Sequence, residues 1–301
     1  PTPSRHEAGG PLPSWSETAT KQTLLDFVDR VTRPGGPDYV PPERRLATFD
    51  LDGTLGCEKP DYVEVVVAMR RLCERAIEQP ALLDDSLYRA ACDGDRTTVD
   101  ADVEQALLQA FEGESQSAYV DYVQRFLSTA HHPRFDRPYG QLYFLPMLEL
   151  VDHLRAHGFA VYVVSGSQQG FVRAFAREVL GLGAERAMGH AVELDVVFDD
   201  GATVLRRGSA FRAPGLDGAG KAEVIRQRLG GPPILAFGNS MGDFEMLRYA
   251  TTGEHPGLGL ILVHDDPEEY VYRDAELIGH AEQYGWQVVG MRDDFERIFP
   301  P

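Results

Sequence analysis

The stretch Arg45-Leu-Ala-Thr-Phe-Asp50-Leu-Asp52-Gly53-Thr54-Leu55 decides the fold of this 301-residue chain. Its first half is a short apolar run with aromatic and β-branched residues, which predicts a buried strand. Its second half places Asp50 and Asp52 one residue apart, where the strand runs into a glycine turn. A site built this way can use one carboxylate as the nucleophile and the other as acid and base. Gly53 allows backbone N–H groups to face an anion.

Outside this stretch, segments with strand and helix patterns alternate along the chain. This alternation predicts a parallel sheet covered by helices on both faces, in which ligands bind at the carboxyl ends of the strands. We therefore expect an α/β fold with a doubly wound, Rossmann-like core. The predicted strands are residues 45–50, 159–164, 234–237, 258–263 and 286–289, with a strand-rich stretch at 187–212. The predicted helices are residues 16–33, 146–157, 168–180, 220–229 and 241–249.

Residues 60–130 differ from the rest because they have helical periodicity and almost no strand signal. A helical segment of this length between two strands of an α/β fold is typical of an inserted cap. We predict a core domain made of residues 1–57 and 140–301, and a helical cap domain of residues 58–139. Such a cap would close over the site, exclude bulk water and select the substrate.

Three further segments carry polar groups at predicted strand ends or helix starts. Ser165 and Gly166 supply a hydroxyl and a flexible backbone after the strand at 159–164. Lys221 begins a helix, where both its ammonium group and the helix N-terminus favour an anion. The segment Phe237-Gly-Asn239-Ser-Met-Gly-Asp243 again joins a strand to a helix and offers oxygen ligands for a hard cation.

These four motifs, in this order, resemble those of the haloacid dehalogenase superfamily. The long gap between Asp50 and Ser165 is similar to the branch that carries a helical cap between its first two motifs, as phosphoserine phosphatase does. The stretches Leu12-Pro-Ser-Trp15, Asp52-Gly-Thr-Leu-Gly-Cys-Glu-Lys-Pro60 and His132-Pro-Arg-Phe135 look similar to bacterial hydrolases of that superfamily. Each motif is weak alone, but the ordered set on alternating elements is specific.

The resemblance implies a role for each motif residue. Asp50 would attack phosphorus and form an aspartyl-phosphate, and Asp52 would protonate the leaving oxygen and later activate water. Lys221 would offset charge in the transition state. The groups implied to bind the substrate phosphate are Gly53, Thr54, Ser165, Gly166 and Lys221. The ligands implied for a Mg²⁺ cofactor are Asp50, the Asp52 carbonyl, Asn239 and Asp243.

Two details of the motifs bear on the reaction. Related dehalogenases lack an acid two residues after the nucleophile and P-type ATPases have threonine there, so Asp52 favours phosphate-ester hydrolysis or phosphoryl transfer. Many relatives have an acidic residue at the position of Asn239. A neutral amide lowers the negative charge of the site, which puts the Mg²⁺ affinity in doubt but leaves the reaction class unchanged.

Three alternative functions stay open at this point. Gly238-Asn-Ser240-Met-Gly242 fits the nucleophile elbow of a serine esterase, with Asp265 or Asp266 and His280 as partners. Against it, few residues follow Ser240, and no His-Gly-Gly segment precedes it. The stretch from Gly215 to Lys221 fits a P-loop, but Ala222 stands where a hydroxyl is needed. A phosphate-binding protein with an inactive site is the non-enzymatic alternative.

Composition limits the partners that this chain can have. The formal net charge of −18 predicts repulsion from nucleic acid and anionic membranes, so we expect neither as a partner. Enclosure of the site by the predicted cap favours a small phosphorylated metabolite as the partner. The apolar runs are too short to cross a bilayer. A cytoplasmic location is favoured, and a removed export signal stays open because the chain starts at Pro1. Of the three cysteines, Cys73 and Cys92 are the pair that would most readily bridge.

Overall fold

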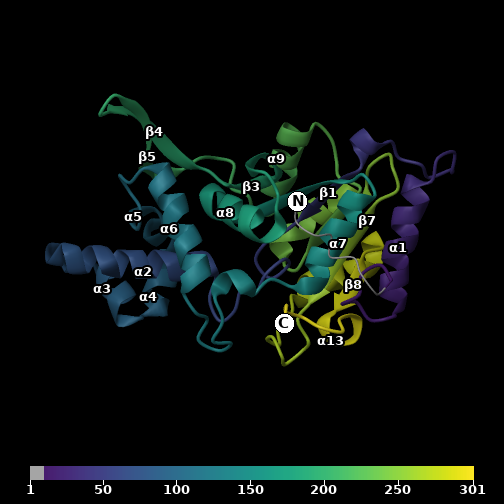
Figure 1. The fold of residues 1–301 in the computed structure, drawn as a ribbon, viewed down its shortest axis with the longest axis horizontal. Helices are drawn as coiled ribbons and strands as arrows, with labels where there is room; N and C mark the ends of the chain where they lie inside the picture. The colour runs from purple at the N-terminus through teal and green to yellow at the C-terminus, as the bar shows by residue number, and fades with distance from the viewer. Residues whose placement is uncertain (1–9) are drawn as a thin grey trace. The chain divides into compact units, whose positions relative to one another are not determined.

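The computed structural model describes residues 10–301 and confirms the α/β fold class. A six-stranded sheet has the order β3-β2-β1-β6-β7-β8, and helices flank it. The described residues form two compact units (Figure 1). The first comprises the described part of Pro1–Cys57 with Leu142–Val164 and Asp217–Pro301, and the second comprises Glu58–Gln141 and Ser165–Leu216. The predicted division into core and cap stays a prediction.

The first unit contains the central strands of the sheet. Strand β1 lies between β2 and β6, which both run parallel to it; Phe49 of β1 is paired with Val163 and Phe237. Every residue of β1 is buried, as expected for a central strand covered on both faces. The strands are β1 (Leu46–Phe49), β2 (Ala160–Gln168), β6 (Leu235–Gly238), β7 (Leu258–Val263) and β8 (Gln287–Gly290).

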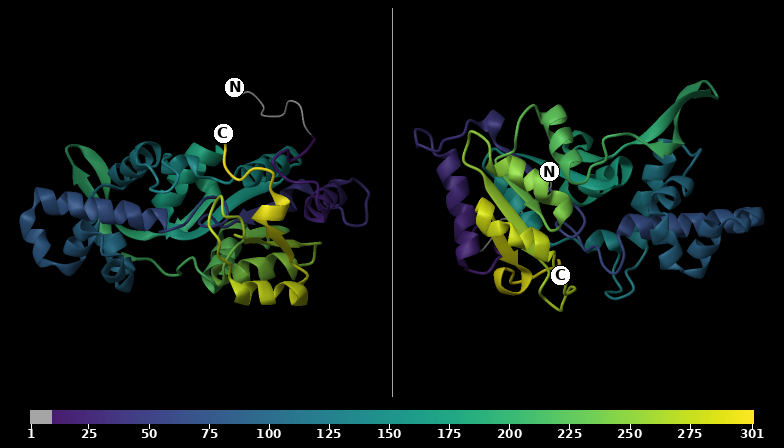
Figure 2. Two further views of the ribbon diagram at one scale, coloured as in Figure 1. Left: turned by 90° about the horizontal axis from the view of Figure 1, so that it is seen from below. Right: turned by 180° about the vertical axis from the view of Figure 1, so that it is seen from behind.

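Four of the seven helices in the described part of the first unit were predicted, and three short ones near the C-terminus were not. Thr18 caps α1 by accepting a hydrogen bond from the backbone of Lys21. Helix α1 packs beside β8, and Figure 2 shows its purple ribbon alongside the yellow C-terminal strand. The helices are α1 (Ala19–Thr32), α7 (Leu145–Ala156), α9 (Ala219–Leu229), α10 (Phe244–Thr251), α11 (Ala275–Gly279), α12 (Ala281–Tyr284) and α13 (Met291–Asp294), with short 3₁₀ turns η1 (Pro42–Arg44) and η5 (Met241–Asp243).

The second unit is mainly helical between residues 58 and 141, as its periodicity predicts. Ser115 caps α6, and Gly94 ends α3 in the left-handed conformation. The helices are α2 (Val63–Glu78), α3 (Ser86–Asp93), α4 (Arg96–Ala101), α5 (Val103–Gln109), α6 (Gln116–Thr129) and α8 (Gln169–Leu180), with 3₁₀ turns η2 (Pro80–Asp84), η3 (Tyr139–Gln141) and η4 (Ala184–Arg186).

The strand-rich stretch of the second unit contains a short strand and a hairpin. Strand β3 (Ala187–His190) is followed by β4 (Val192–Asp199) and β5 (Ala202–Phe211), which pair antiparallel. The base of the hairpin packs on α5 and α6, and its far end extends away from them (Figure 1). Val196 and Phe198 near that end are largely exposed.

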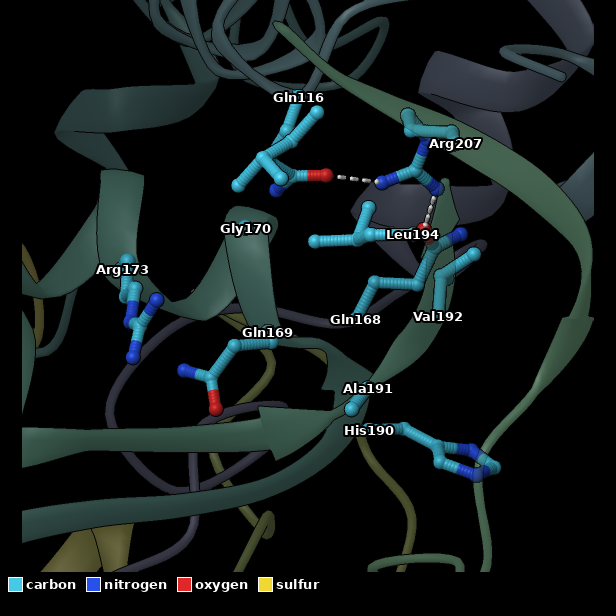
Figure 3. A pocket seen from close by; sticks show the side chains of 11 residues that line it. Gln116, Gln168, Gln169, Gly170, Arg173, His190, Ala191, Val192, Leu194 and Arg207 are labelled. Atoms are coloured by element: carbon cyan, nitrogen blue, oxygen red, sulfur yellow. Dashed lines mark hydrogen bonds between the residues drawn. The ribbon is translucent and has the colours of Figure 1, made fainter. Parts of the chain in front are cut away.

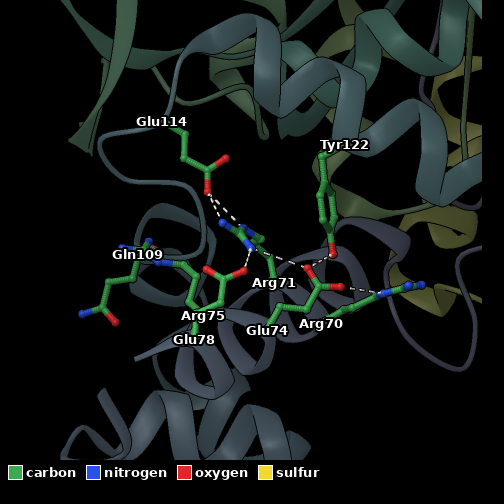
Figure 4. A network of polar contacts seen from close by, with 8 residues as sticks. All are labelled: Arg70, Arg71, Glu74, Arg75, Glu78, Gln109, Glu114 and Tyr122. Carbon is green, nitrogen blue, oxygen red and sulfur yellow. Dashed lines mark hydrogen bonds and ion pairs between the residues drawn. The ribbon is translucent and has the colours of Figure 1, made fainter. Parts of the chain in front are cut away.

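Ion pairs and a disulfide hold the helices of the second unit together. Arg71 of α2 donates to Glu114 at 2.8 Å, and the Tyr122 hydroxyl of α6 donates to Glu74 of α2 at 2.9 Å (Figure 4). Cys73 and Cys92 form a disulfide between α2 and α3, while Cys57 is buried and takes no part in it. Within residues 10–301, no helix combines the length and the apolar character that a membrane span needs.

Candidate active site

Asp50 directly follows the buried central strand β1, so the sheet places it at the carboxyl edge. Its backbone N–H donates to the carbonyl of Phe237 in β6 at 2.9 Å, which continues the ladder one residue beyond β1. The chain then turns: the amides of Leu55 and Gly56 both donate to the Leu51 carbonyl. Gly53 has a φ of +74°, a conformation that side chains disfavour. Asp52, within this turn, is half-buried.

The segment after β6 forms a compact turn around Asp243. One oxygen of its carboxylate, Oδ2, accepts hydrogen bonds from the amides of Asn239 at 2.9 Å and Ser240 at 3.1 Å. Ser240 and Asp243 form a capping box, in which each side chain bonds the backbone of the other. A Cβ atom on Gly238 would lie 2.4 Å from the Asp243 Cβ. Gly238 therefore leaves the space that Asp243 occupies.

Lys221 joins the two segments that carry Asp50 and Asp243. It lies in the first turn of α9, and its Nζ donates to Asp50 Oδ1 at 2.5 Å and to Asp243 Oδ1 at 2.6 Å. The loop before α9 is tied to the same turn, because Gly218 N donates to the Gly242 carbonyl at 2.9 Å. The side chains of the three charged residues are at most 8% exposed, so water screens their charges little.

The charges at this site shift the pKa values of both Asp50 and Lys221. Burial, and then the negative charge of Asp243, raise the pKa of Asp50 well above its ordinary value, although Lys221 opposes the shift. Burial alone would lower the pKa of Lys221, but Asp243 and Asp50 together outweigh it and raise this pKa. Lys221 therefore stays an ammonium ion.

The oxygen atoms available at this site fit a divalent cation. Asp50, Asp243, the amide of Asn239 and the carbonyl of Asp52 are hard donors of the kind that Mg²⁺ prefers. Thr54 Oγ1 donates to Asn239 Oδ1 at 3.3 Å and so links the first and fourth motifs. Over the described range 10–301, no three Asp, Glu, His or Cys side chains are grouped to hold a metal. This result is consistent with a metal site in which the Asn239 amide and the Asp52 carbonyl take the place of acidic ligands.

The structure brings together most of the predicted site residues, and all of these lie in the first unit. They are Asp50, Asp52, Gly53, Thr54, Lys221, Asn239 and Asp243. Ser165 and Gly166 belong to the second unit. Ser165 is buried, and its Oγ accepts from the Ser167 amide at 3.0 Å; Gly166 is exposed. Strand β2 runs on to Gln168, so Ser165 lies within this strand and not after its end.

The residues of the esterase alternative have other partners. Ser240 caps η5, and His280 packs its ring on Phe244 with the centroids 4.8 Å apart. Asp265 accepts a hydrogen bond from the amide of Arg292. Across residues 10–301, no hydrogen bond joins Ser240 to a histidine. The P-loop alternative lacks its strand, because β5 before this loop belongs to the antiparallel hairpin.

Sequence reasoning missed a histidine at the same edge of the sheet. His264 directly follows β7, and its Nε2 lies 2.8 Å from the Gly53 carbonyl. The signal was its position: a polar residue at the end of a predicted buried strand, like Asp50. No local sequence pattern pairs residue 264 with residue 53.

Sequence reasoning also missed a cavity of about 170 Å³ within the second unit, between α6, α8 and the hairpin (Figure 3). The buried guanidinium of Arg207 lines it and donates to the side-chain oxygens of Gln116 and Gln168. The Arg207 guanidinium also lies 4.0 Å from the ring centroid of Tyr119, whose hydroxyl donates to Glu64. These contacts tie α2, α6 and β5 together through polar groups.

Comparison with known proteins confirms the resemblance to the haloacid dehalogenase superfamily. Residues 47–248 match the family model described as haloacid dehalogenase-like hydrolase. The fold is similar to that of a protein with unknown function from Bordetella pertussis Tohama I (TM-score 0.54, 18% identity, 82% of this chain and 98% of that chain). It is also similar to a functionally unknown protein from Anaerococcus prevotii DSM 20548 (TM-score 0.53, 16% identity, 87% and 89%). No curated protein matches the sequence.

Proposed function

The chain belongs to the haloacid dehalogenase-like hydrolase family, and we propose that it is a Mg²⁺-dependent phosphomonoesterase that acts on a small phosphorylated metabolite. The observation that carries this proposal is the position of Lys221, whose ammonium group bridges Asp50 and Asp243 in a buried site. A nucleophilic carboxylate, a fixed cation and hard oxygen donors at one edge of the sheet are the groups that phosphoryl transfer requires.

In the first step an Asp50 oxygen attacks phosphorus, and the bond from phosphorus to the ester oxygen breaks. The electron pair of that bond stays on the leaving oxygen, which takes the proton of Asp52 and departs as an alcohol. The product on the enzyme is an aspartyl-phosphate. In the second step Asp52 takes a proton from water, the water oxygen attacks phosphorus, and Asp50 is released together with inorganic phosphate.

Lys221 contributes fixed positive charge in both steps. Its ammonium group is already held by two carboxylates, so it needs little reorganisation as negative charge develops on the phosphoryl oxygens. Asp50, the Asp52 carbonyl, Asn239 and Asp243 would hold Mg²⁺, which offsets the charge of Asp50 and of the phosphoryl group when bound. The backbone of the Gly53 turn and Thr54 would contact the phosphate, with Ser165 and Gly166 from the second unit.

The net charge of −18 supports a small substrate over a polyanion. Nucleic acid would meet long-range repulsion over most of the surface, whereas a single phosphate group needs only the local positive charge of Lys221 and a metal ion. We accordingly propose neither a nucleic acid nor a membrane as partner. The predicted cap role of residues 58–139 supports the same choice, because an enclosed site admits only small esters.

The test is phosphate release from p-nitrophenyl phosphate, with Mg²⁺ and with EDTA, by the wild type and by Asp50→Asn. Asp195→Asn, an exposed aspartate of the β4–β5 hairpin, is the matched control. We expect turnover that requires the metal, vanishes in Asp50→Asn and persists in Asp195→Asn. Equal turnover by Asp50→Asn would refute the nucleophile assignment. Hydrolysis of p-nitrophenyl acetate in EDTA would instead favour a serine esterase based on Ser240.

A further inference from the structure

A buried histidine outside the four motifs contacts the turn that carries the proposed acid and base. His264 follows β7, which is the neighbour of β6, so it lies at the same carboxyl edge as Asp50. Its side chain is 1% exposed. A polar ring buried this deeply must have hydrogen-bond partners, and the partners of His264 are the Gly53 carbonyl, the Glu269 carboxylate and the Tyr272 hydroxyl.

The ring nitrogens of His264 face two different acceptors. Nε2 lies 2.8 Å from the carbonyl oxygen of Gly53, and Nδ1 lies 3.0 Å from Oε2 of Glu269. A carbonyl oxygen can only accept, so Nε2 must carry a hydrogen to bond Gly53, and Nδ1 must carry one to bond the carboxylate of Glu269. The Tyr272 ring is stacked on the imidazole, with the centroids 4.1 Å apart and the planes 17° apart. Its hydroxyl lies 3.1 Å from Nε2, so the Tyr272 hydroxyl and the Gly53 carbonyl are both partners of this nitrogen.

Glu269 fixes the orientation of the His264 ring. Its side chain is completely buried, and Oε2 also accepts the amide hydrogen of Tyr270 at 2.6 Å. The loop that connects the pair is closed by the Tyr272 amide, which donates to the His264 carbonyl at 2.9 Å. A carboxylate that holds one nitrogen of an imidazole fixes the orientation of the ring and so the direction of the other nitrogen.

The Gly53 carbonyl is a sensitive point of the site. Gly53 is the residue after Asp52, it has no side chain, and its φ of +74° lies in the left-handed region, which glycine adopts without strain. Holding its carbonyl fixes the plane of the peptide that joins Gly53 to Thr54. The residues on both sides of the glycine are then constrained: Asp52 before it, and Thr54, which donates to Asn239, after it.

We propose that His264, held by Glu269, is a positioning residue that fixes the Gly53 carbonyl and thereby aims the Asp52 carboxyl at the leaving oxygen. This inference rests on the proposed function, since it assigns His264 a part in proton donation by Asp52. His264 touches neither the phosphoryl group nor the metal ligands in the proposed reaction. It acts through the backbone of the turn.

The role in proton donation predicts a dependence on the leaving group. Esters of acidic phenols depart with little help from a general acid, whereas esters of weakly acidic phenols need the proton. We compare kcat/KM, which reports the first step, for p-nitrophenyl, phenyl and 4-methoxyphenyl phosphate. In His264→Phe, which keeps a ring beside Tyr272 but has no donor, we expect a loss of about 10-fold on the nitrophenyl ester and about 10²-fold or more on the methoxyphenyl ester.

Two companion variants separate the hydrogen bond from simple loss of packing. His264→Gln carries an amide nitrogen that can replace Nε2 as donor to Gly53, so it should recover most of the methoxyphenyl activity. Val289→Ala opens a cavity in β8, beside β7, and should lower the unfolding temperature while reducing kcat/KM for all three esters equally. An equal loss on all esters in His264→Phe, or no rescue in His264→Gln, would overturn the proposal.

A second measurement does not depend on catalysis. The amides of Gly53, Leu55 and Gly56 are bonded within the turn, so their hydrogen exchange reports its order. We expect exchange in residues 50–57 to be about 10-fold faster in His264→Phe and unchanged in Val289→Ala. Unchanged exchange in His264→Phe would overturn the positioning role. A wild type that hydrolyses no aryl phosphate refutes the proposed function, and the exchange result still decides whether His264 holds the turn.

Discussion

The Nζ atom of Lys221 lies 2.5 Å from Oδ1 of Asp50, and both side chains are almost completely buried. Lys221 makes a second contact of 2.6 Å with Asp243, so a single ammonium group is shared by two carboxylates. The three residues come from the ends of β1 and β6 and the start of α9, which are far apart in sequence. This contact unites three of the four motifs in one electrostatic unit.

Lys221→Ala should lower both activity and stability. Without the ammonium group, kcat with Mg²⁺ should fall by about 10²-fold or more, the cost of one lost electrostatic stabiliser. Two buried carboxylates would lose their partner, which costs about 3 kcal/mol of unfolding free energy. Activity assays and urea unfolding measure the two effects. Lys21→Met, which removes a buried lysine of α1, should leave kcat unchanged. A loss confined to stability would identify Lys221 as a structural residue.

Asp50→Asn should raise the unfolding temperature of the metal-free protein at neutral pH. Folding raises the pKa of Asp50 above its ordinary value of 3.8, so the folded wild type binds a proton more readily than the unfolded chain. Its stability therefore falls as pH rises from the ordinary pKa through the raised one. Asparagine does not titrate, so the variant does not lose stability in this way as pH rises. In EDTA, the variant and the wild type should have the same unfolding temperature at pH values below the ordinary pKa. At pH values above the raised pKa, the variant should unfold at the higher temperature. A variant that is less stable at every pH would contradict this prediction.

Asn239→Asp should strengthen Mg²⁺ binding. The substitution restores a negative charge beside Thr54 and adds to the charge of Asp50 and Asp243, and the number of charged ligands tunes the affinity for a divalent ion. We expect the Mg²⁺ concentration for half-maximal activity to fall by about 10-fold, and to rise in Asn239→Ala. Calorimetric titration with Mg²⁺ gives the same comparison without substrate. If the two substitutions leave the Mg²⁺ requirement unchanged, residue 239 is not a ligand.

Removal of the disulfide should destabilise the second unit. The bridge between Cys73 and Cys92 closes a loop across a sequence separation of 19 residues, and such a constraint on the unfolded chain is worth about 3 kcal/mol. The double variant Cys73→Ser/Cys92→Ser should unfold at a lower temperature, and reductant should lower the wild type toward it. Cys57→Ser serves as the control. Labelling of all three thiols in the unfolded, unreduced protein would show that the bridge is absent.

Most elements of the fold were predictable because their signals are local. The apolar run before Asp50 is a central strand, and the alternation after residue 145 gives the observed order of helices and strands. Helices α11, α12 and α13 were missed, since four or five residues are too few to show helical periodicity. The far end of β2 was also missed: residues 165–168 are in strand conformation although they contain two serines and a glycine.

The residues of the candidate site were likewise predicted only in part. Asp50, Lys221 and Asp243 were found because each lies in a short motif with its own neighbours. His264 escaped because its partner Gly53 is 211 residues away, and an isolated histidine after a strand has many explanations. The buried contacts of Arg207 with Gln116 and Gln168 escaped for the same reason. Local sequence thus predicts where a strand ends, but it does not predict which distant side chain supports that end.

The close approach of Gly238 to Asp243 has a consequence for mutational surveys of this enzyme. Any side chain at position 238 would collide with the carboxylate that holds Lys221, so even alanine would disturb the charged groups without touching the substrate. In a scan scored by activity, Gly238 would rank with the nucleophile. Sensitivity to substitution therefore cannot by itself distinguish residues that perform the chemistry from a residue that is required only because it leaves room for a neighbouring side chain.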